Sequence, residues 1–376
     1  MKNFLPFTRP TLDAETISGV VEVLNSGWLA SGPQVVSFEE ELAKYLGGNR
    51  TVRSLNSGTA ALETALILCG IGPGDEVIVP AMTFVATANV VVRTGAKPVF
   101  VDVELESRNL DLNQLEAAIT PRTRAIMPVH LAGLPVDLDS LYQIAERHGL
   151  RVIEDAAQAI GSSFAGRKIG SCGDLVCFSF HPNKNMTTIE GGALSVGSNV
   201  SVEQLEKLRF HGISRNSEGE MDVSIVGDKL NLSDVAARIG LGQLKRLDEF
   251  NAKRRILASR YFELLASDPP GVLPARGDSG HNWHMFTILL PFDQLGLTRV
   301  EFQKIMHDKG IGVGVHYPAL HLFSLYRAMG YREGQFPNAE RIGRETVTLP
   351  LFPAMDSSDV DRVCDTLRET LSAGMA

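Results

Sequence analysis

The sequence predicts an α/β protein built on a mixed, mostly parallel sheet, with a smaller α+β domain at its C-terminal end. Over the first three quarters of the chain, short β-branched runs alternate with segments of helical apolar spacing. This alternation favours right-handed crossovers and a sheet covered by helices on both faces. After about residue 234 it gives way to one long helical stretch and a few mixed elements. The 376 residues, 44% apolar and 21% charged, can bury a large core without disulfides or metal.

Apolar runs and turn residues set the boundaries in the first part. The run Asn56-Ser57-Gly58 leads into a helix, and Pro80 ends a strand because proline cannot donate to the ladder. In chain order the expected elements are a helix over 59–69, a strand over 76–79, a helix over 83–93, strands over 98–101 and 124–127, a helix over 137–149, and strands over 151–154, 175–180 and 192–196.

A long helix is expected over 235–265, with Asn251 as a candidate break and Asp268-Pro269-Pro270-Gly271 as its stop. The elements expected after it are a strand over 285–290, a helix over 299–309, a candidate strand over 313–316 and a final helix over 358–371. We therefore divide the chain into a large domain with an N-terminal arm, residues 1–250, and a small domain, residues 251–376.

Charge and hydropathy argue against several classes of protein. The 44 acidic and 36 basic residues give a net charge of −8, without any Lys/Arg run. We therefore expect neither a nucleic-acid nor a membrane partner, although a local pocket for a phosphorylated small molecule remains compatible. The N-terminal residues lack a signal-peptide pattern, and no stretch is long and apolar enough to span a membrane. This predicts a cytoplasmic protein.

Metal and dinucleotide sites are not indicated. The four cysteines form no C-x-x-C pair, and the nine histidines form no H-E-x-x-H or Cys/His cluster. We expect reduced thiols and no metal site. The glycine-rich run 70–74 follows a helix and precedes a strand, which is typical of a turn rather than of a dinucleotide-binding loop.

Three segments carry residues suited to chemistry. In the first, over 56–62, small and hydroxyl residues enter a helix, where free N–H groups suit a phosphate, although Ser and Thr also simply cap helices. In the second, an apolar strand ends at Glu154-Asp155 and small residues follow. Ligands of open α/β sheets bind at such strand ends, but an Asp that caps the next helix is an equally good explanation.

The third segment, over 178–192, is the most informative. An apolar strand delivers Ser179 and then Lys184, followed by hydroxyl residues and the pair Gly191-Gly192. A lysine on a constrained turn beside a cavity is a candidate Schiff-base nucleophile, whereas most lysines are solvated surface charges. Lys184 lies 29 residues after Asp155, one strand-to-strand step away.

Together the three segments resemble the pyridoxal-phosphate (PLP) enzymes of the aspartate-aminotransferase fold, and more narrowly the DegT/DnrJ/EryC1/StrS family of nucleotide-sugar aminotransferases. The resemblance extends from Gly27-Trp28 through the Ser-Phe-His-Pro-x-Lys and Glu-Gly-Gly runs to Gly312 and to the Leu-Pro-Leu-Phe-Pro run over 349–353. The opening Phe-Leu-Pro-Phe run resembles the branch that aminates UDP-4-keto-arabinose. The resemblance implies a fold-type-I PLP transferase and a homodimer with shared active sites.

The resemblance also assigns roles to residues. It implies that Lys184 forms a Schiff base with PLP and then moves protons, and that Asp155 keeps the pyridine nitrogen protonated. Gln158 would bind the phenolic oxygen, and Phe84 would stack on the ring or simply pack the core. The residues implied for the cofactor phosphate are Gly58, Thr59, Ser179 and, from the neighbouring subunit, Asn231.

Substrate contacts are implied for Trp28, His316 and Tyr317, with structural packing as the alternative. His281 and His284 are interpreted as residues of the second domain, at its surface or in its core. The sequence departs from the family pattern at Leu230, where an aromatic residue is usual, and at Ile189, where glycine is common.

The resulting expectation is an aminotransferase (transaminase) that moves an amino group from L-glutamate, leaving 2-oxoglutarate, to a keto carbon of a nucleotide-linked sugar, as in lipopolysaccharide or other polysaccharide biosynthesis. The alternatives are an aminotransferase for a non-nucleotide ketone and a non-catalytic PLP-binding regulator. A sugar dehydratase of the same family would carry histidine at the position of Lys184.

Overall fold

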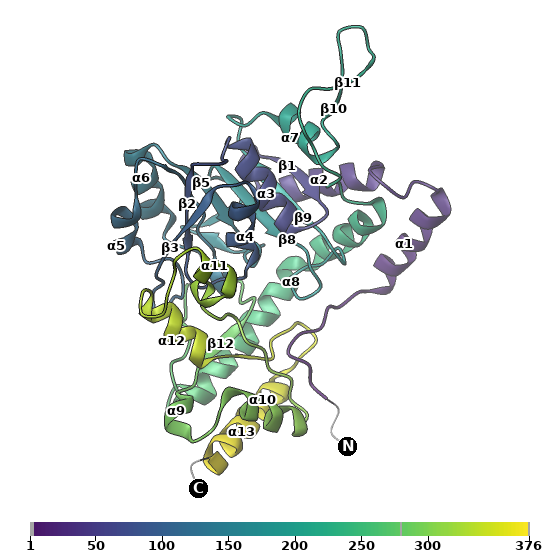
Figure 1. The fold of residues 1–376 in the computed structure, drawn as a ribbon. Helices are drawn as coiled ribbons and strands as arrows, with labels where there is room; N and C mark the ends of the chain where they lie inside the picture. The colour runs from purple at the N-terminus through teal and green to yellow at the C-terminus, as the bar shows by residue number, and fades with distance from the viewer. Residues whose placement is uncertain (1–3, 279, 375–376) are drawn as a thin grey trace.

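The structure of the protein, a computed structural model, describes residues 4–278 and 280–374. A seven-stranded sheet forms its upper part, in the strand order β1-β9-β8-β5-β4-β2-β3 (Figure 1). The strands are β1 (Thr51–Leu55), β2 (Glu76–Pro80), β3 (Lys97–Val101), β4 (Thr123–Ile126), β5 (Arg151–Asp155), β8 (Leu175–Ser179) and β9 (Gly192–Val196). Within this sheet only β9 runs against the others, so the sheet is mixed and mostly parallel, as predicted.

Helices cover both faces of the sheet. Along β2, Val77 and Val79 pack on the face that carries α3 (Gly58–Leu68) and α4 (Ala86–Arg93). Ile78, between them, packs on the opposite face with α2 (Pro33–Leu46), α6 (Leu138–His148) and the first half of α8 (Asp234–Leu265). The alternation follows from the two-residue period of a strand, and burial on both faces explains why these strands are apolar throughout.

Local signals explain where these helices begin and end. Side chains of Ser57, Asp137 and Ser233 accept hydrogen bonds from the first turns of α3, α6 and α8. Gly149 ends α6 in the left-handed conformation that glycine adopts without strain. The predicted helix over 83–93 begins later than expected, at Ala86, and the other predicted helices and strands of this part agree within two residues.

The lower part of the molecule is built around the C-terminal half of α8. The strands β12 (Phe286–Leu289) and β13 (Thr346–Leu349) pair antiparallel, and α10 (Arg299–Asp308) and α13 (Ser357–Gly374) pack with them around a separate apolar cluster. The helix α8 joins this part to the sheet without interruption, so the break expected at Asn251 is wrong (Figure 1). The division into domains at residue 250 stays a prediction.

The strand expected over 313–316 is also wrong. Only Gly314 forms a bridge, to Thr348, because the segment turns away to place His316 and Tyr317 toward the sheet. The short segment η3 (Leu320–Leu322) and α12 (Pro337–Glu345) then pack on the cluster of the sheet rather than on the lower one.

Further elements complete the chain. They are α1 (Ala14–Ser26), α5 (Leu112–Leu115), η1 (Glu116–Ala118), η2 (Leu131–Gly133), β6 (Ser163–Phe164), β7 (Arg167–Lys168), α7 (Val202–Arg209), β10 (Ile213–Arg215), β11 (Met221–Val223), α9 (Phe292–Leu295) and α11 (Ser324–Ala328). The hairpin β10–β11 projects from the top of the molecule (Figure 1).

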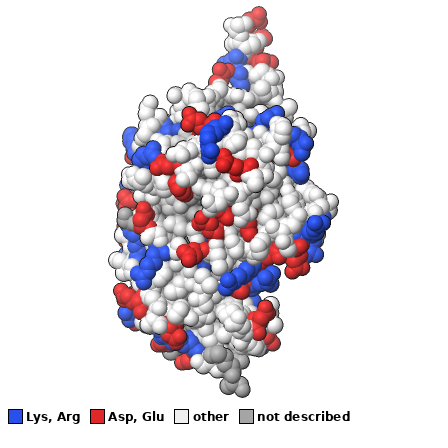
Figure 2. All heavy atoms as spheres, turned by 90° about the vertical axis from the view of Figure 1, so that its left-hand side faces the viewer, with Lys and Arg blue, Asp and Glu red and all other residues white. Residues whose placement is uncertain are grey.

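The surface carries mixed charge. Figure 2 shows lysine and arginine interspersed with aspartate and glutamate on the face in view. Among the described residues, no helix has the length and apolar content needed to cross a bilayer.

Candidate active site

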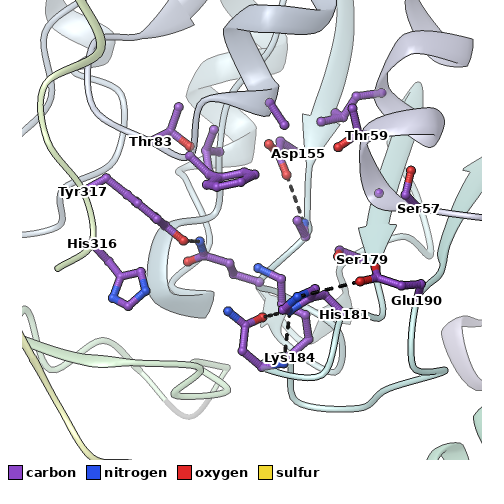
Figure 3. Close-up of a pocket in the computed structure, with 18 residues that line it drawn as sticks. Ser57, Thr59, Thr83, Asp155, Ser179, His181, Lys184, Glu190, His316 and Tyr317 are labelled. Atoms are coloured by element: carbon purple, nitrogen blue, oxygen red, sulfur yellow. Dashed lines mark hydrogen bonds and ion pairs between the residues drawn. The ribbon is translucent and has the colours of Figure 1, made fainter. Parts of the chain in front are cut away.

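A cavity of about 310 Å³ opens where β5 and β8 end and α3 begins. The sheet positions its polar side chains directly, because Asp155 is the last residue of β5 and Ser179 is the last residue of β8. Figure 3 shows Asp155 and Lys184 on facing sides of this cavity, with Tyr317 reaching in from the lower part of the chain. The carboxyl ends of parallel strands are where open α/β sheets bind ligands.

One end of the cavity is suited to an anion. The N–H groups of Gly58 and Thr59, in the first turn of α3, have no acceptor within the helix, and the Ser179 side chain lines the same end. A Cβ atom on Gly58 would lie 2.8 Å from the Ser179 Cβ, so glycine is needed for this close packing. Helix dipole and free N–H groups together favour a phosphate here.

Asp155 provides a fixed negative group on the cavity floor. Its carboxylate accepts hydrogen bonds from the Thr87 hydroxyl at 2.8 Å and from the Ala157 N–H at 3.1 Å. Burial raises the pKa of this carboxyl, while the two hydrogen bonds and the charge of Lys184 act in the opposite direction. A buried carboxylate of this kind is stabilised by a cationic group placed beside it.

Lys184 supplies the amine of the cavity, and its side chain is partly buried. It follows a tight turn in which its own N–H donates to the His181 carbonyl at 2.8 Å. Burial lowers the pKa of the Lys184 amine to about 8, although the charge of Asp155 opposes this shift. Near neutral pH a useful fraction of this amine is therefore uncharged and nucleophilic, unlike that of a surface lysine.

Gln158 and two aromatic residues form the side wall. The Gln158 side-chain oxygen accepts from the Ala132 N–H at 2.6 Å, and its amide nitrogen donates to the Tyr317 hydroxyl at 3.1 Å. The rings of Phe84 and Tyr317 lie 5.9 Å apart, and Phe84 is 52% exposed within the cavity lining. Phe84 therefore presents a free face to a planar ligand rather than packing the core.

His316 lines the cavity next to Tyr317. Its Nδ1 lies 2.7 Å from the Thr348 hydroxyl. Burial, with a smaller contribution from the charge of Lys184, lowers the pKa of His316 to about 4, and burial raises the pKa of Tyr317. Both side chains are therefore neutral hydrogen-bonding groups near pH 7.

Two predicted site residues lie outside the cavity of their own chain. Trp28 is 63% exposed at the end of α1. The Asn231 side chain bonds to Ser31 and to Lys229, and Asn231 does not line the cavity. Their proposed roles stay predictions, and for Asn231 the predicted role belongs to the neighbouring subunit.

The structure also adds residues that sequence reasoning did not assign. Thr87 holds Asp155, and His181, Asn183 and Glu190 line the cavity. The last three lie within the run 178–192, so the motif itself contained the signal. Thr87 had none, because its contact with Asp155 joins positions 68 residues apart.

Comparison with known proteins identifies the same family that the sequence motifs resemble. Residues 10–368 match the DegT/DnrJ/EryC1/StrS aminotransferase family. The chain is 40% identical to the spore coat polysaccharide biosynthesis protein SpsC of Bacillus subtilis, over 98% of this chain and 97% of that one.

Two solved structures are similar over nearly the whole chain. The putative sugar aminotransferase Spr1654 of Streptococcus pneumoniae, in its PMP form, superposes with a TM-score of 0.92 at 31% identity, covering 99% of this chain and 98% of that one. DesV of S. venezuelae, in complex with a ketimine intermediate, gives a TM-score of 0.89 at 37% identity, covering 98% and 99%. Spr1654 is also known in a PLP form.

The cavity fits PLP, which the PLP form of Spr1654 contains. The N-terminus of α3 would suit the phosphate, the carboxylate of Asp155 would suit the pyridine nitrogen, and the amine of Lys184 would suit the aldehyde carbon. Gln158 keeps one amide hydrogen for the phenolic oxygen after donating the other to Tyr317. Each charged or polar part of the cofactor thus has a main-chain or side-chain group of matching chemistry in the cavity.

Proposed function

Because this chain belongs to the DegT/DnrJ/EryC1/StrS aminotransferase family and is a fold-type-I, PLP-dependent enzyme, we propose that it transfers an amino group from L-glutamate to a keto carbon of a nucleotide-linked sugar. The observation that carries the proposal is the meeting of a partly buried amine, Lys184, and a buried carboxylate, Asp155, in one cavity. The name of SpsC, a polysaccharide biosynthesis protein, and that of Spr1654, a putative sugar aminotransferase, support a sugar as acceptor.

PLP supplies an electron sink that makes the proton on the carbon bearing the nitrogen removable. The residues of the chain would each have a separate role in this reaction. The Asp155 carboxylate would hold a proton on the pyridine nitrogen, and Gln158 and Phe84 would fix the plane of the ring. The Lys184 amine would move the proton between the substrate carbon and the cofactor, and its pKa of about 8 suits that exchange.

The sugar would bind beside Lys184, between the ring of the cofactor and the segment from the lower part of the chain. His316 and Tyr317, neutral and close to the cavity, are suited to sugar hydroxyl groups. Trp28 is proposed as an additional contact at the entrance. Among the described residues that line the cavity there is no arginine. We therefore propose that cationic groups outside the cavity lining bind the nucleotide diphosphate and the carboxylates of glutamate.

We propose that a second copy of the chain supplies part of that environment, in a homodimer with shared active sites. The exposed face of α1 carries Ile17, Val21 and Leu24, each more than half exposed, with Trp28 after them. The projecting hairpin and its base add Met221, Val223 and Val226. Ile17, Val21 and Leu24 share one face of α1 by their spacing, and an exposed apolar face of this kind is typical of a protein–protein contact. Asn231 would complete the phosphate site of the partner subunit.

The first experiment is the visible absorbance of the purified protein before and after L-glutamate. We expect a yellow protein that bleaches toward the pyridoxamine spectrum, and a Lys184→Ala variant that does not. A yellow protein unchanged by glutamate would contradict glutamate as the donor and favour the non-catalytic alternative. A protein that stays colourless after PLP is added would overturn the role of Lys184.

The acceptor is tested next, with the pyridoxamine-loaded protein and UDP-4-keto-arabinose, a 4-keto pentose. Mass spectrometry should find the aminated nucleotide sugar and return of the yellow colour. A matched 4-keto sugar without the nucleotide should be at least ten times slower, because binding energy from the nucleotide orients the sugar carbon. Equal rates would instead support the non-nucleotide alternative. The cytoplasmic location stays a prediction.

A further inference from the structure

A buried polar network lies behind the cavity and does not line it. Its side chains are those of Asn185, Asn251, Asn282 and His284, each at most 5% exposed. They come from three distant parts of the chain: the turn after Lys184, the middle of α8, and the segment before β12. Buried amides and imidazoles are costly unless their hydrogen bonds are made, so a completed network fixes the segments that carry it.

The network holds the turn of Lys184 through the next residue. The Asn185 amide nitrogen donates to the Asn251 side-chain oxygen at 2.8 Å and to the Asn282 carbonyl at 3.2 Å. The Asn185 side-chain oxygen is therefore the acceptor for His284 Nδ1, at 3.0 Å. This arrangement places the imidazole proton on Nδ1. Burial lowers the pKa of His284 well below its ordinary value, with the charge of Lys184 acting in the same direction, so the ring is neutral.

The same network holds Gln158. The Asn282 amide nitrogen donates to the carbonyls of Gln158 and Ile160 at 3.0 and 2.9 Å, and Asn251 donates to Ile160 as well. The main-chain N–H of His284 donates at 2.9 Å to the carbonyl of Ala132. The main-chain N–H of Ala132 in turn donates to the Gln158 side-chain oxygen. Both the main chain and the side chain of Gln158 are thus tied to the segment 282–284.

Two glycines show how closely the parts approach. A Cβ atom on Gly133 would lie 1.7 Å from the Asn282 side-chain oxygen, and one on Gly161 would lie 2.4 Å from the Asn251 amide nitrogen. Both glycines have positive φ angles, of 89° and 78°. The loops over 130–133 and 158–161 therefore lack side chains where the network needs space.

We propose that Asn185 and His284 are positioning residues that hold Lys184 and Gln158 in a fixed position relative to each other. Lys184 would then reach the reactive carbon of the cofactor while Gln158 binds its phenolic oxygen. The inference rests on the proposed roles of Lys184 and Gln158 in holding PLP. Neither Asn185 nor His284 lines the cavity, so they act through the two residues that do. A misplacement of about 1 Å at a reacting group can cost on the order of 100-fold in rate.

The test uses His284→Ala and Asn185→Ala, which remove the two sides of one hydrogen bond. In the holoenzyme, we expect kcat for the glutamate half-reaction to fall about 10- to 100-fold, with KM changed less than about threefold. The double variant should lose no more than the larger single effect, because both changes break the same link. His284→Asn, whose amide nitrogen can replace Nδ1, should recover most of the rate.

A second readout does not depend on activity. In protein stripped of cofactor, hydrogen exchange measured by mass spectrometry should increase in the peptides over 181–188 and 156–162 together in His284→Ala. The matched control is His321→Ala, since His321 is also buried and bonds to Glu340 at 2.9 Å, outside the network. It should lower the melting temperature without changing exchange in those two peptides.

The outcomes separate this inference from the function on which it rests. If the His284→Ala variant has a lower melting temperature but exchange, kcat and absorbance like those of the control, the network has only a structural role. That result would overturn the inference. If the wild type does not bind PLP, the proposed function fails, whereas coupled exchange of the two peptides still supports the fixed position of Lys184 and Gln158 relative to each other. If His284→Ala does not fold, Asn185→Ala and His284→Asn carry the same test.

Discussion

The floor of the cavity and the outer face around α1 and the hairpin β10–β11 are built in opposite ways. On the floor, Asp155 and Gln158 have hydrogen-bond partners from the same chain, and Lys184 is fixed through its turn. On the outer face, Val21, Leu24 and Met221 are more than half exposed among the residues that the structure describes. The difference is consistent with the proposed homodimer, in which one chain would complete the cofactor side of the site and a partner would cover the outer side.

The largest expected effect is on the floor, at Lys184. Lys184→Ala should reduce transamination by at least about 1,000-fold, because it removes both the attachment point and the proton-transfer group. The melting temperature of the cofactor-free protein should be unchanged or higher, since a partly buried amine is lost. Steady-state kinetics and calorimetry measure the two quantities. Full activity in this variant would contradict the proposed mechanism.

Asp155→Ala tests the other side of the floor. Without the carboxylate, the pyridine nitrogen loses its partner, and the rate should fall about 100- to 1,000-fold. Cofactor retention should fall as well, and PLP remaining after dialysis measures it. Thr87→Val is the matched change, since it removes one hydrogen bond to the carboxylate and should have a smaller effect in the same direction. Equal retention in Asp155→Ala and the wild type would refute the pairing.

The outer face is tested by Val21→Glu on α1. Placing a charge on a surface that two copies bury should convert the dimer to a monomer, which light scattering after gel filtration would show as a halved mass. Activity should fall with the dimer, by about tenfold or more, while the fold stays intact. Val300→Glu, at a valine of α10 that is more exposed than Val21, is the control and should change neither. A wild type that is already monomeric and active would remove the shared-site proposal.

The contrast between the two regions also explains what the sequence could predict. Strands, the long helix, Lys184 and Asp155 were predictable because periodicity, caps and the motif runs are local signals. The pairing of Asn185 with Asn251 and of Asn282 with Gln158 joins residues more than 60 positions apart. For that reason Asn251 was interpreted as a helix break and His284 only as a residue of the second domain. The segment 313–316 is predicted as a strand from its own residues alone. Its path in the structure is instead set by contacts of the neighbouring residue Tyr317.

Ile189 lies at the border of the two regions and gives the smallest expected effect. It has a φ angle of 73°, which is strained for a β-branched residue. Ile189→Gly should relieve that strain, offset in part by the greater freedom of glycine in the unfolded chain, and stabilise the protein by about 1 kcal/mol. Chemical denaturation measures it, with Val226→Gly, at an exposed residue without positive φ, as the control. Destabilisation by Ile189→Gly would instead mean that the exposed Ile189 side chain is covered by the partner, which would extend the outer face to the edge of the cavity.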